Sequence, residues 1–170
     1  QCNPARLVST GAKIDKAALA QRPCFLCEKN RPAIQTQIPI DNDFELLVNP
    51  FPILPLHFTI PAKVHQPQLI REHYGKMRRL LESFEHLTVF YNGPKCGASA
   101  PDHMHLQAGT GSHFPLRDNW EQLYSNRQTL LSTPDGSELA AINNYACPAF
   151  AIVGRDAKAD IALFEALYKA

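Results

Sequence analysis

Proline is the residue type that most constrains how this chain folds. Fourteen of the 170 residues are proline, and each one fixes φ and lacks the backbone N–H that helices and sheets use. The apolar run at 56–60, for example, is enclosed by Pro55 and Pro61. We therefore predict many short elements joined by rigid turns rather than a helical bundle.

Charge and hydropathy narrow the class of protein. The 17 Lys and Arg residues against 16 Asp and Glu residues leave a net charge of +1, which argues against a general nucleic-acid or anionic-membrane surface. No apolar run reaches the roughly 18 residues of a membrane span, and the start of the chain lacks the pattern of a signal peptide. We expect a cytoplasmic protein with no nucleic-acid or membrane partner.

The hydrophobic pattern predicts an α+β fold. Runs of apolar, β-branched and aromatic residues predict strands at 43–48, 56–60 and 87–91. A period near 3.6 predicts an amphipathic helix over 68–85, and the alternation at 103–107 predicts a fourth strand. Strands and helix in this order, with short connections, predict an antiparallel β-sheet with a helix packed on one face.

The chain divides by the strength of its pattern. Residues 1–110 carry every motif described below and are predicted to form the core domain. Residues 111–170 are predicted to be a C-terminal extension, with weaker signals for a strand at 148–153 and a helix at 158–169. Because the helical pattern runs to the last residue, we expect this extension to belong to a longer second lobe.

Two of the five cysteines form a C-x-x-C pair, Cys24 and Cys27. Five cysteines do not make a complete disulfide framework. Such a pair in a cytosolic protein is usually half of a metal site or a redox dithiol, and the redox form lies between a strand and a helix. Here Pro23 and Pro32 place it in a turn between loops, which favours a metal. The remaining ligands would then be histidines or carboxylates.

A loop of small residues at 92–100 has the composition of an anion site. It begins with Asn92, and Gly97 and its neighbours are small enough for backbone N–H groups to converge on a phosphate. Lys95 adds a positive charge and Ser99 adds a hydroxyl. We predict that this segment, called the small-residue loop below, binds phosphate.

The strand predicted after this loop carries His103, His105 and Gln107. On a strand these three side chains point to one side, about 6.8 Å apart in succession. They could be ordinary polar residues of a half-exposed strand. A phosphate-binding loop leading directly into them favours instead a nucleophilic phosphoryl-transfer site.

Four motifs lie along residues 22–109: P-L-H-F-T-I-P, Asn92-Gly93, Gly97 to Ser99, and H-M-H-L-Q. In combination they resemble the histidine triad superfamily. The glutamine in the last motif resembles the nucleotidyltransferase and phosphorylase branch, which includes galactose-1-phosphate uridylyltransferases and the phosphorylases of dinucleotides and nucleoside diphosphate sugars. The resemblance implies a histidine-triad-like fold.

The resemblance also implies roles for two residues of H-M-H-L-Q. In that branch the middle histidine, here His105, attacks the α-phosphorus of a nucleotide and carries the nucleotidyl group. Hydrolases of the superfamily have a third histidine where this chain has Gln107, whose amide donates a hydrogen bond but does not shuttle protons. Transfer to a phosphate or sugar phosphate acceptor is therefore expected. Members often build the site across a dimer, so a homodimer is one expected assembly.

A structural zinc ion is a further implication. Related uridylyltransferases hold zinc with a C-x-x-C pair, a histidine after the second strand and the first histidine of the H-x-H-x-Q motif. The residues at the matching positions are Cys24, Cys27, His65 and His103. His57 also lies nearby in sequence; it is an alternative third ligand, or a partner that orients an active-site imidazole.

The resulting prediction is a nucleotidyltransferase or phosphorylase that acts on a nucleoside diphosphate sugar or dinucleotide through a nucleotidyl-histidine. Two alternatives are a nucleotide hydrolase of the same superfamily and a zinc-stabilised nucleotide-binding module. A Cys96 nucleophile is a weaker alternative, and Arg6 and His113 are expected on the surface. The predicted substrate-binding residues are His57, Asn92, Lys95, Gly97 and Ser99.

Overall fold

The computed structural model describes residues 16–111 and 114–170, so Arg6 and His113 lie outside the described residues. The chain forms two compact units. The first unit comprises the residues up to Ile70 with Ser83–Gly111, and the second comprises Arg71–Glu82 with Ser112–Ala170.

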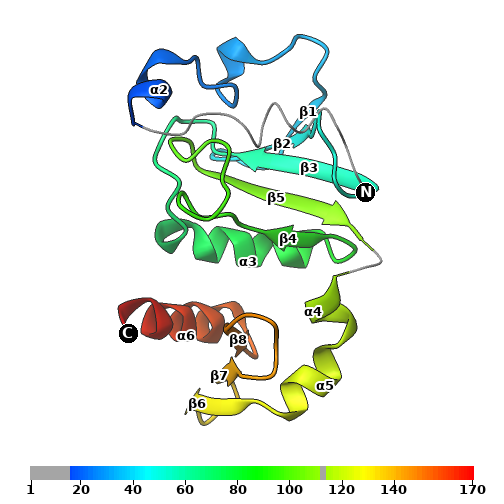
Figure 1. Ribbon diagram of the computed structural model, residues 1–170, viewed down its shortest axis with the longest axis vertical. Helices are drawn as coiled ribbons and strands as arrows, with labels where there is room; N and C mark the ends of the chain where they lie inside the picture. Colours follow the sequence, from blue (N-terminus) through cyan, green and yellow to red (C-terminus); the bar gives the residue numbers. More distant parts are fainter. Residues whose placement is uncertain (1–15, 112–113) are drawn as a thin grey trace. The chain divides into compact units, whose positions relative to one another are not determined.

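The first unit contains a five-stranded antiparallel sheet with the order β1-β2-β3-β5-β4 (Figure 1). Two short helices, α2 (Lys16–Gln21) and η2 (Glu28–Asn30), precede it. This sheet confirms the predicted α+β class. The strands are β1 (Gln37–Pro39), β2 (Glu45–Val48), β3 (Leu56–Pro61), β4 (Thr88–Phe90) and β5 (His105–Thr110).

Side chains alternate between the two faces of β5, because successive residues of a strand point in opposite directions. Leu106 and Ala108 are fully buried on one face. His105 and Gln107 lie on the other face, and the register of β3 against β5 puts His57 on that same face. The pair of strands β3 and β5 therefore has two hydrophobic side chains on one face and three polar side chains on the other.

Gly109 allows β3 and β5 to approach closely beside His57. A Cβ atom at Gly109 would lie 2.5 Å from the carbonyl oxygen of Leu56 and 2.5 Å from Cδ1 of Leu54. The first of these is a backbone atom, which a side chain does not displace without moving the strand. A glycine is therefore needed at this point of the sheet.

The helix predicted at 68–85 is shorter in the structure. A 3₁₀ turn, η3 (Arg71–His73), leads into α3 (Tyr74–Ser83). Gln68 belongs instead to the preceding loop: its backbone N–H bonds to the carbonyl of Pro101, 3.4 Å away, and its carbonyl accepts a hydrogen bond from the Tyr91 hydroxyl at 2.8 Å. These backbone groups are held by loops, so no helical turn forms there.

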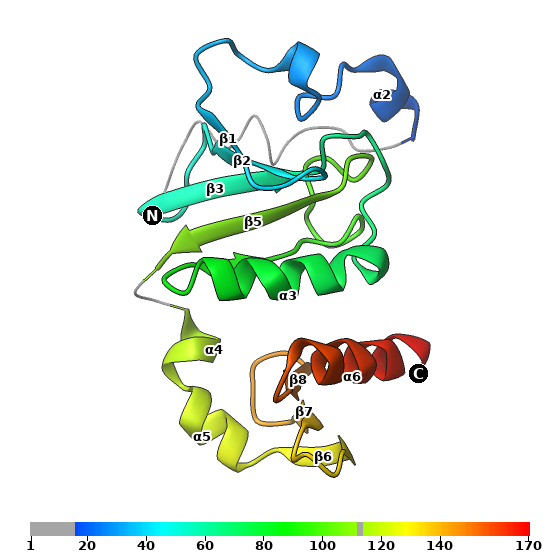
Figure 2. The same cartoon turned by 180° about the vertical axis from the view of Figure 1, so that it is seen from behind.

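The second unit combines helices with a three-stranded antiparallel sheet of order β6-β7-β8 (Figure 2). Its last two elements confirm the strand and the helix predicted near the end of the chain. The sequence did not predict β6 and β7. Besides η3 and α3, the elements are α4 (Pro115–Asp118), α5 (Trp120–Ser125), β6 (Gln128–Ser132), β7 (Glu138–Ile142), β8 (Ala149–Val153) and α6 (Ala157–Lys169).

Aromatic and ionic contacts join α3 to α6 within the second unit. The rings of Tyr74 and Phe164 stack with their centroids 3.9 Å apart. Arg78 forms an ion pair with Asp160, whose side chain is 9% exposed. A helix cap fixes the start of α6, since the Asp156 carboxylate accepts a hydrogen bond from the backbone of Ala159. Paired charges and stacked rings thus join the two helices, in addition to the hydrophobic cluster of Leu123, Ile142 and Ala151 elsewhere in the unit.

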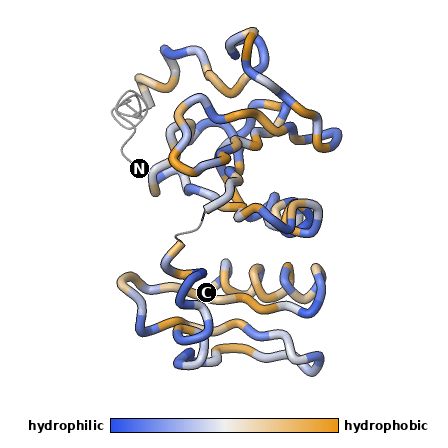
Figure 3. Tube along the Cα trace, turned by 90° about the vertical axis from the view of Figure 1, so that its right-hand side faces the viewer, coloured by the Kyte–Doolittle hydropathy of each residue, from blue (hydrophilic) through white to orange (hydrophobic). Residues whose placement is uncertain are grey.

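Hydropathy is evenly mixed along the chain. Hydrophobic and hydrophilic residues are interspersed along the trace of both units (Figure 3). Within residues 16–111 and 114–170, every helix is too short or too polar to cross a bilayer.

Candidate functional site

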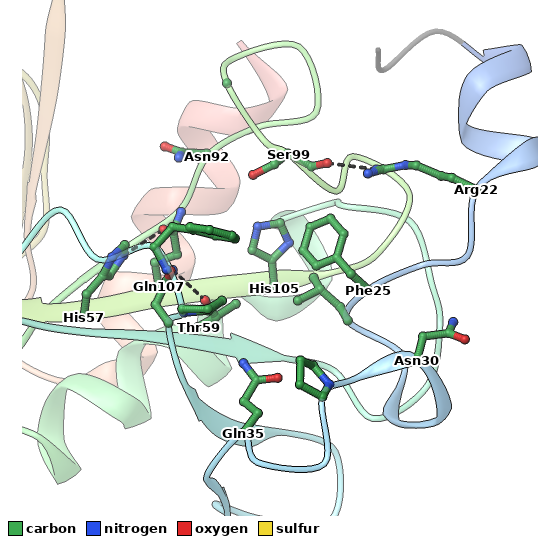
Figure 4. A pocket seen from close by; sticks show the side chains of 16 residues that line it. Arg22, Phe25, Asn30, Gln35, His57, Thr59, Asn92, Ser99, His105 and Gln107 are labelled. Carbon is green, nitrogen blue, oxygen red and sulfur yellow. Dashed lines mark hydrogen bonds between the residues drawn. The ribbon is translucent and has the colours of Figure 1, made fainter. Parts of the chain in front are cut away.

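The first unit contains a cavity of about 540 Å³ (Figure 4). Its volume is in the range of small-molecule sites, about 300–1,000 Å³. Residues from β3, β5, the small-residue loop and the segment around the cysteine pair line it. Predicted site residues brought together there are His57, Asn92, Gly97, Ser99, His105 and Gln107.

Two residues considered in the sequence lie on a turn of the small-residue loop and outside the cavity lining. Lys95 and Cys96 are both exposed and neither is among the residues that line the cavity. The turn, residues 94–97, ends with Gly97, whose φ of 89° is a conformation that residues with a side chain rarely adopt. Gly97 and Ser99 reach the cavity while Lys95 faces solvent.

His105 is held as one tautomer. Its Nδ1 atom lies 2.8 Å from the backbone carbonyl of His103, and because a carbonyl only accepts, Nδ1 carries the proton. The Nε2 atom then keeps its lone pair. Burial lowers the pKa of His105, so the ring is neutral at pH 7. A neutral imidazole with a free Nε2 lone pair is the form required of a nucleophile.

Gln68 fixes the position of His105, and sequence reasoning missed it. Its side chain is fully buried. The Oε1 atom accepts a hydrogen bond from the backbone N–H of His105 at 2.7 Å, and the Nε2 atom donates to the carbonyls of His105 and Asn92 at 3.0 Å each. One amide therefore ties the start of β5 to the small-residue loop. The helix predicted over this segment concealed the role.

His57 orients Gln107. The backbone N–H of Ile53 donates to Nδ1 of His57 at 3.3 Å, so Nε2 of His57 carries the proton and donates to Oε1 of Gln107 at 3.0 Å. This bond fixes the Gln107 amide with its oxygen toward His57 (Figure 4). The nitrogen of that amide is left as the donor group on the cavity side.

The strand predicted at 103–107 starts later, so one of its residues was misplaced. β5 begins at His105. The backbone N–H of His103 bonds to the carbonyl of Ala100 at 3.2 Å, and that of Met104 bonds to Gln66 at 2.7 Å. A turn therefore replaces the first two residues of the predicted strand. His103 does not share a face with His105 but turns toward Cys24.

The four residues implied as zinc ligands lie together. Their ligand atoms are all within 4.8 Å of one another. Sγ of Cys24 lies 3.2 Å from Nδ1 of His103, and Sγ of Cys27 lies 3.3 Å from Nδ1 of His65. Tetrahedral bonds of about 2.3 Å to sulfur and 2.1 Å to nitrogen separate such atoms by about 3.6 Å. This metal cluster, Cys24, Cys27, His65 and His103, therefore fits a metal ion.

Both histidines of the metal cluster have partners on their second ring nitrogen. Nε2 of His103 lies 2.7 Å from the carbonyl of Ala62, within hydrogen-bond distance. Nε2 of His65 lies 3.7 Å from Oδ2 of Asp102, an electrostatic contact without a hydrogen bond. Such partners orient a metal-binding imidazole and fix which nitrogen is free to bind. Burial lowers the pKa of His103, which favours the neutral ring that a ligand needs. A lone aspartate such as Asp102 carries no motif, so the sequence did not single it out.

Comparisons with known proteins place the chain in a family. No curated protein matched the chain. Among solved structures, a histidine triad protein from Clostridium difficile is similar, with 17% sequence identity and a TM-score of 0.38, over 54% of this chain and 90% of that chain. At this extent the likeness assigns neither activity nor substrate. The family described as "Domain of unknown function (DUF4922)" matches residues 1–110, and the chain therefore belongs to that family.

Proposed function

We propose that the chain is a nucleotidyltransferase or phosphorylase that forms a covalent nucleotidyl-His105 intermediate. The observation that supports this most directly is the tautomer of His105, with Nδ1–H bonded to the carbonyl of His103 in a cavity-lining position. Ser99 and Gln107 line the same cavity and supply donors for phosphoryl oxygens. A nucleoside diphosphate sugar or a dinucleotide is the substrate class that such a site serves.

The reaction has two displacements at one phosphorus. The lone pair on Nε2 of His105 attacks the α-phosphorus, the P–N bond forms, and the leaving group departs with the electron pair of the broken P–O bond. An oxygen of an acceptor phosphate then attacks the same phosphorus, and the P–N electron pair returns to Nε2. The Nδ1 proton stays on the imidazole throughout, stabilised by the His103 carbonyl.

The surrounding residues lower the barrier by positioning and charge stabilisation. Donors fixed before the reaction stabilise the charge on the phosphoryl oxygens without reorganising. Gln107 is fixed by His57 and the backbone of His105 is fixed by Gln68. An imidazole held in line with the phosphorus of the bound substrate reacts in an effectively unimolecular step, which avoids the entropy cost of bringing two molecules together. Because an amide does not shuttle protons, water is a poor acceptor in this scheme.

The metal cluster would hold zinc as a structural ion. Four protein ligands close the coordination sphere, so a bound zinc would supply folding energy rather than an open Lewis-acid position. His103 provides a ligand nitrogen through its side chain and orients His105 through its backbone carbonyl. The ion would therefore stabilise the segment on which the tautomer of His105 depends.

Trapping the intermediate tests the proposal. The protein is mixed with UDP-sugars, ADP-sugars and dinucleotides labelled at the α-phosphate, and acid-labile label on the protein is measured. We expect an adduct in the wild-type chain and in Cys96→Ser, and none in His105→Gly. An adduct that survives in His105→Gly, or no adduct with any of these substrates, would contradict the proposal. Product release that is independent of added phosphate would indicate a hydrolase instead.

A further inference from the structure

One formally charged side chain stands among the residues that line the cavity, that of Arg22. The other lining residues that the structure describes are apolar, hydroxyl, amide and imidazole groups. The wall therefore has a single fixed positive charge and no carboxylate. A cavity of this composition favours an anionic ligand and gives the anion one preferred place to bind.

Arg22 is fixed beside the small-residue loop. Its Nη2 atom donates to the backbone carbonyl of Ser99 at 2.8 Å (Figure 4), and its guanidinium carbon lies 5.4 Å from the centre of the Phe25 ring. Arg22 precedes Cys24 by two residues, so the turn of the cysteine pair determines where it lies. The side chain is 24% exposed, and it belongs to the lining of the cavity.

Arg22 has unused donor capacity. Its Nε atom is buried and has no hydrogen-bond partner among the described residues, although buried donors are nearly always paired. Asp102 forms a long ion pair with Arg22, its Oδ1 atom 3.6 Å from Nη2, too far for a hydrogen bond. That oxygen is also buried without a hydrogen-bond partner among the described residues. The bond to Ser99 uses one of five N–H groups. The guanidinium is therefore held in place without being saturated.

We propose that Arg22 binds the substrate phosphate on the leaving-group side of the α-phosphate. This assignment rests on the proposed function, in which Ser99 and His105 hold and attack the α-phosphate. A guanidinium bonded to the Ser99 carbonyl stands next to that position, and its planar fork matches the oxygens of a phosphate. The preferred ligands are consequently nucleoside diphosphates or their esters, and nucleoside monophosphates bind more weakly.

Binding of paired ligands tests this role. Calorimetry measures the affinities of AMP, ADP, UMP, UDP and inorganic pyrophosphate for the wild-type protein, Arg22→Gln, Arg22→Lys and Lys158→Gln. We expect the wild-type protein to prefer each diphosphate to its monophosphate. Arg22→Gln should weaken the diphosphates and pyrophosphate about 10- to 100-fold while changing the monophosphates little. Arg22→Lys keeps the charge but loses the fork, so it should restore only part of the affinity.

The control variant and the possible outcomes distinguish the proposed role of Arg22 from the proposed nucleotidyl transfer. Lys158→Gln removes a positive charge from an exposed position of α6 and should change no affinity. Thermal unfolding and the zinc content of Arg22→Gln and Arg22→Lys show whether each variant is folded. A diphosphate preference unchanged in a folded Arg22→Gln overturns the role of Arg22, even if the His105 adduct forms. Arg22-dependent binding of pyrophosphate without any adduct supports Arg22 and contradicts the transferase. Absence of binding by all five ligands overturns both.

Discussion

The second unit and the cavity of the first unit use their polar side chains in different ways. In the second unit, cations are paired with carboxylates: Arg71 with Glu165, Arg78 with Asp160, and Arg127 with Glu138. Around the cavity of the first unit, the polar side chains are mostly neutral rings and amides, bonded to backbone or to one another. A paired charge is satisfied by its partner, whereas a neutral ring bonded on one side keeps a reactive atom on the other. The comparison sets the paired charges of the second unit against the neutral side chains around the cavity, which suit the proposed chemistry; outside the cavity the first unit also has an ion pair, Arg31 with Glu45 at 2.7 Å.

Removal of the metal should have the largest effect. Protein purified without added metal should contain about one zinc ion per chain, and a strong chelator should unfold the first unit. Structural zinc contributes about 10–16 kcal/mol, against a total stability of about 5–15 kcal/mol for a domain. Elemental analysis measures the zinc, and hydrogen exchange locates the loss of protection.

The Cys24→Ser variant should have the same effect as the chelator, because it removes one of the four metal ligands. Its loss of protection should fall on the residues around the metal cluster, and the paired charges of the second unit should keep theirs. Loss of protection spread equally over both units would remove the contrast between them. If the purified protein contained no metal and a chelator did not lower its stability, the metal cluster would be excluded as a structural site.

Gln68→Ala should be the next most damaging change. It leaves the backbone N–H of His105 and the two carbonyls that Gln68 bonds without their partner. Each buried group left unpaired costs about 1–3 kcal/mol, so we expect a loss of about 3 kcal/mol or more in urea unfolding, together with loss of the His105 adduct. Gln68→Glu keeps the shape and the acceptor for His105 but sets a buried carboxylate against the two carbonyls, so it should cost at least as much. A loss below about 1 kcal/mol in either variant would show that the bonds of Gln68 carry little weight.

Arg78→Gln tests the second unit. It leaves the buried carboxylate of Asp160 without its cation, which should cost about 1–3 kcal/mol. Formation of the His105 adduct should be unchanged at temperatures where the variant is folded. Arg79→Gln removes an exposed cation from the same helix and should cost less than about 1 kcal/mol. If Arg78→Gln abolished the adduct in folded protein, the separation of stability from chemistry would be wrong.

The smallest effect is the pH dependence contributed by Glu138. Hydrogen bonds from Arg127, Thr129 and Tyr124 lower the pKa of Glu138 from 4.5 to about 2. A pKa lowered by folding gives stability that is fully present above about pH 4.5 and is lost as the pH falls towards 2. Glu138→Gln should therefore be less stable than wild type at pH 7 and should approach it at pH 2. Urea unfolding at both pH values measures the difference, and an equal difference at both would contradict it.

The sequence identified those parts of the site that are carried by local motifs. The C-x-x-C spacing of the cysteine pair indicated a metal site. In the structure Cys24 and Cys27 lie together with His65 and His103. Alternation along the chain placed His105 and Gln107 on one face of a strand, which the structure confirms. Both inferences depend on residues that are close in sequence, where backbone geometry fixes the relation between side chains.

The parts that the sequence did not reveal depend on contacts between distant segments. Gln68 and His105 are 37 residues apart, and Arg22 and Ser99 are 77 apart. An isolated glutamine or arginine belongs to no repeating pattern, and in the sequence it looks like any of the many glutamines and arginines found on protein surfaces. The helix predicted from Gln68 failed for the same reason, because loop contacts claimed its backbone groups. Lys95 was predicted from charge alone, and the turn directs it to solvent.

His103 takes part in the metal cluster and in the cavity site through different atoms. Its ring belongs to the metal cluster, and its carbonyl oxygen fixes the tautomer of His105. Any amino acid at position 103 supplies that carbonyl, so a descendant chain that loses the imidazole loses a ligand but keeps the backbone acceptor. Where other bonds, such as those of Gln68, replace the stabilising effect of the ion, a chain without the metal would still hold His105 in the tautomer that the proposed reaction needs. Metal binding and the tautomer can therefore be lost separately, although one residue serves both.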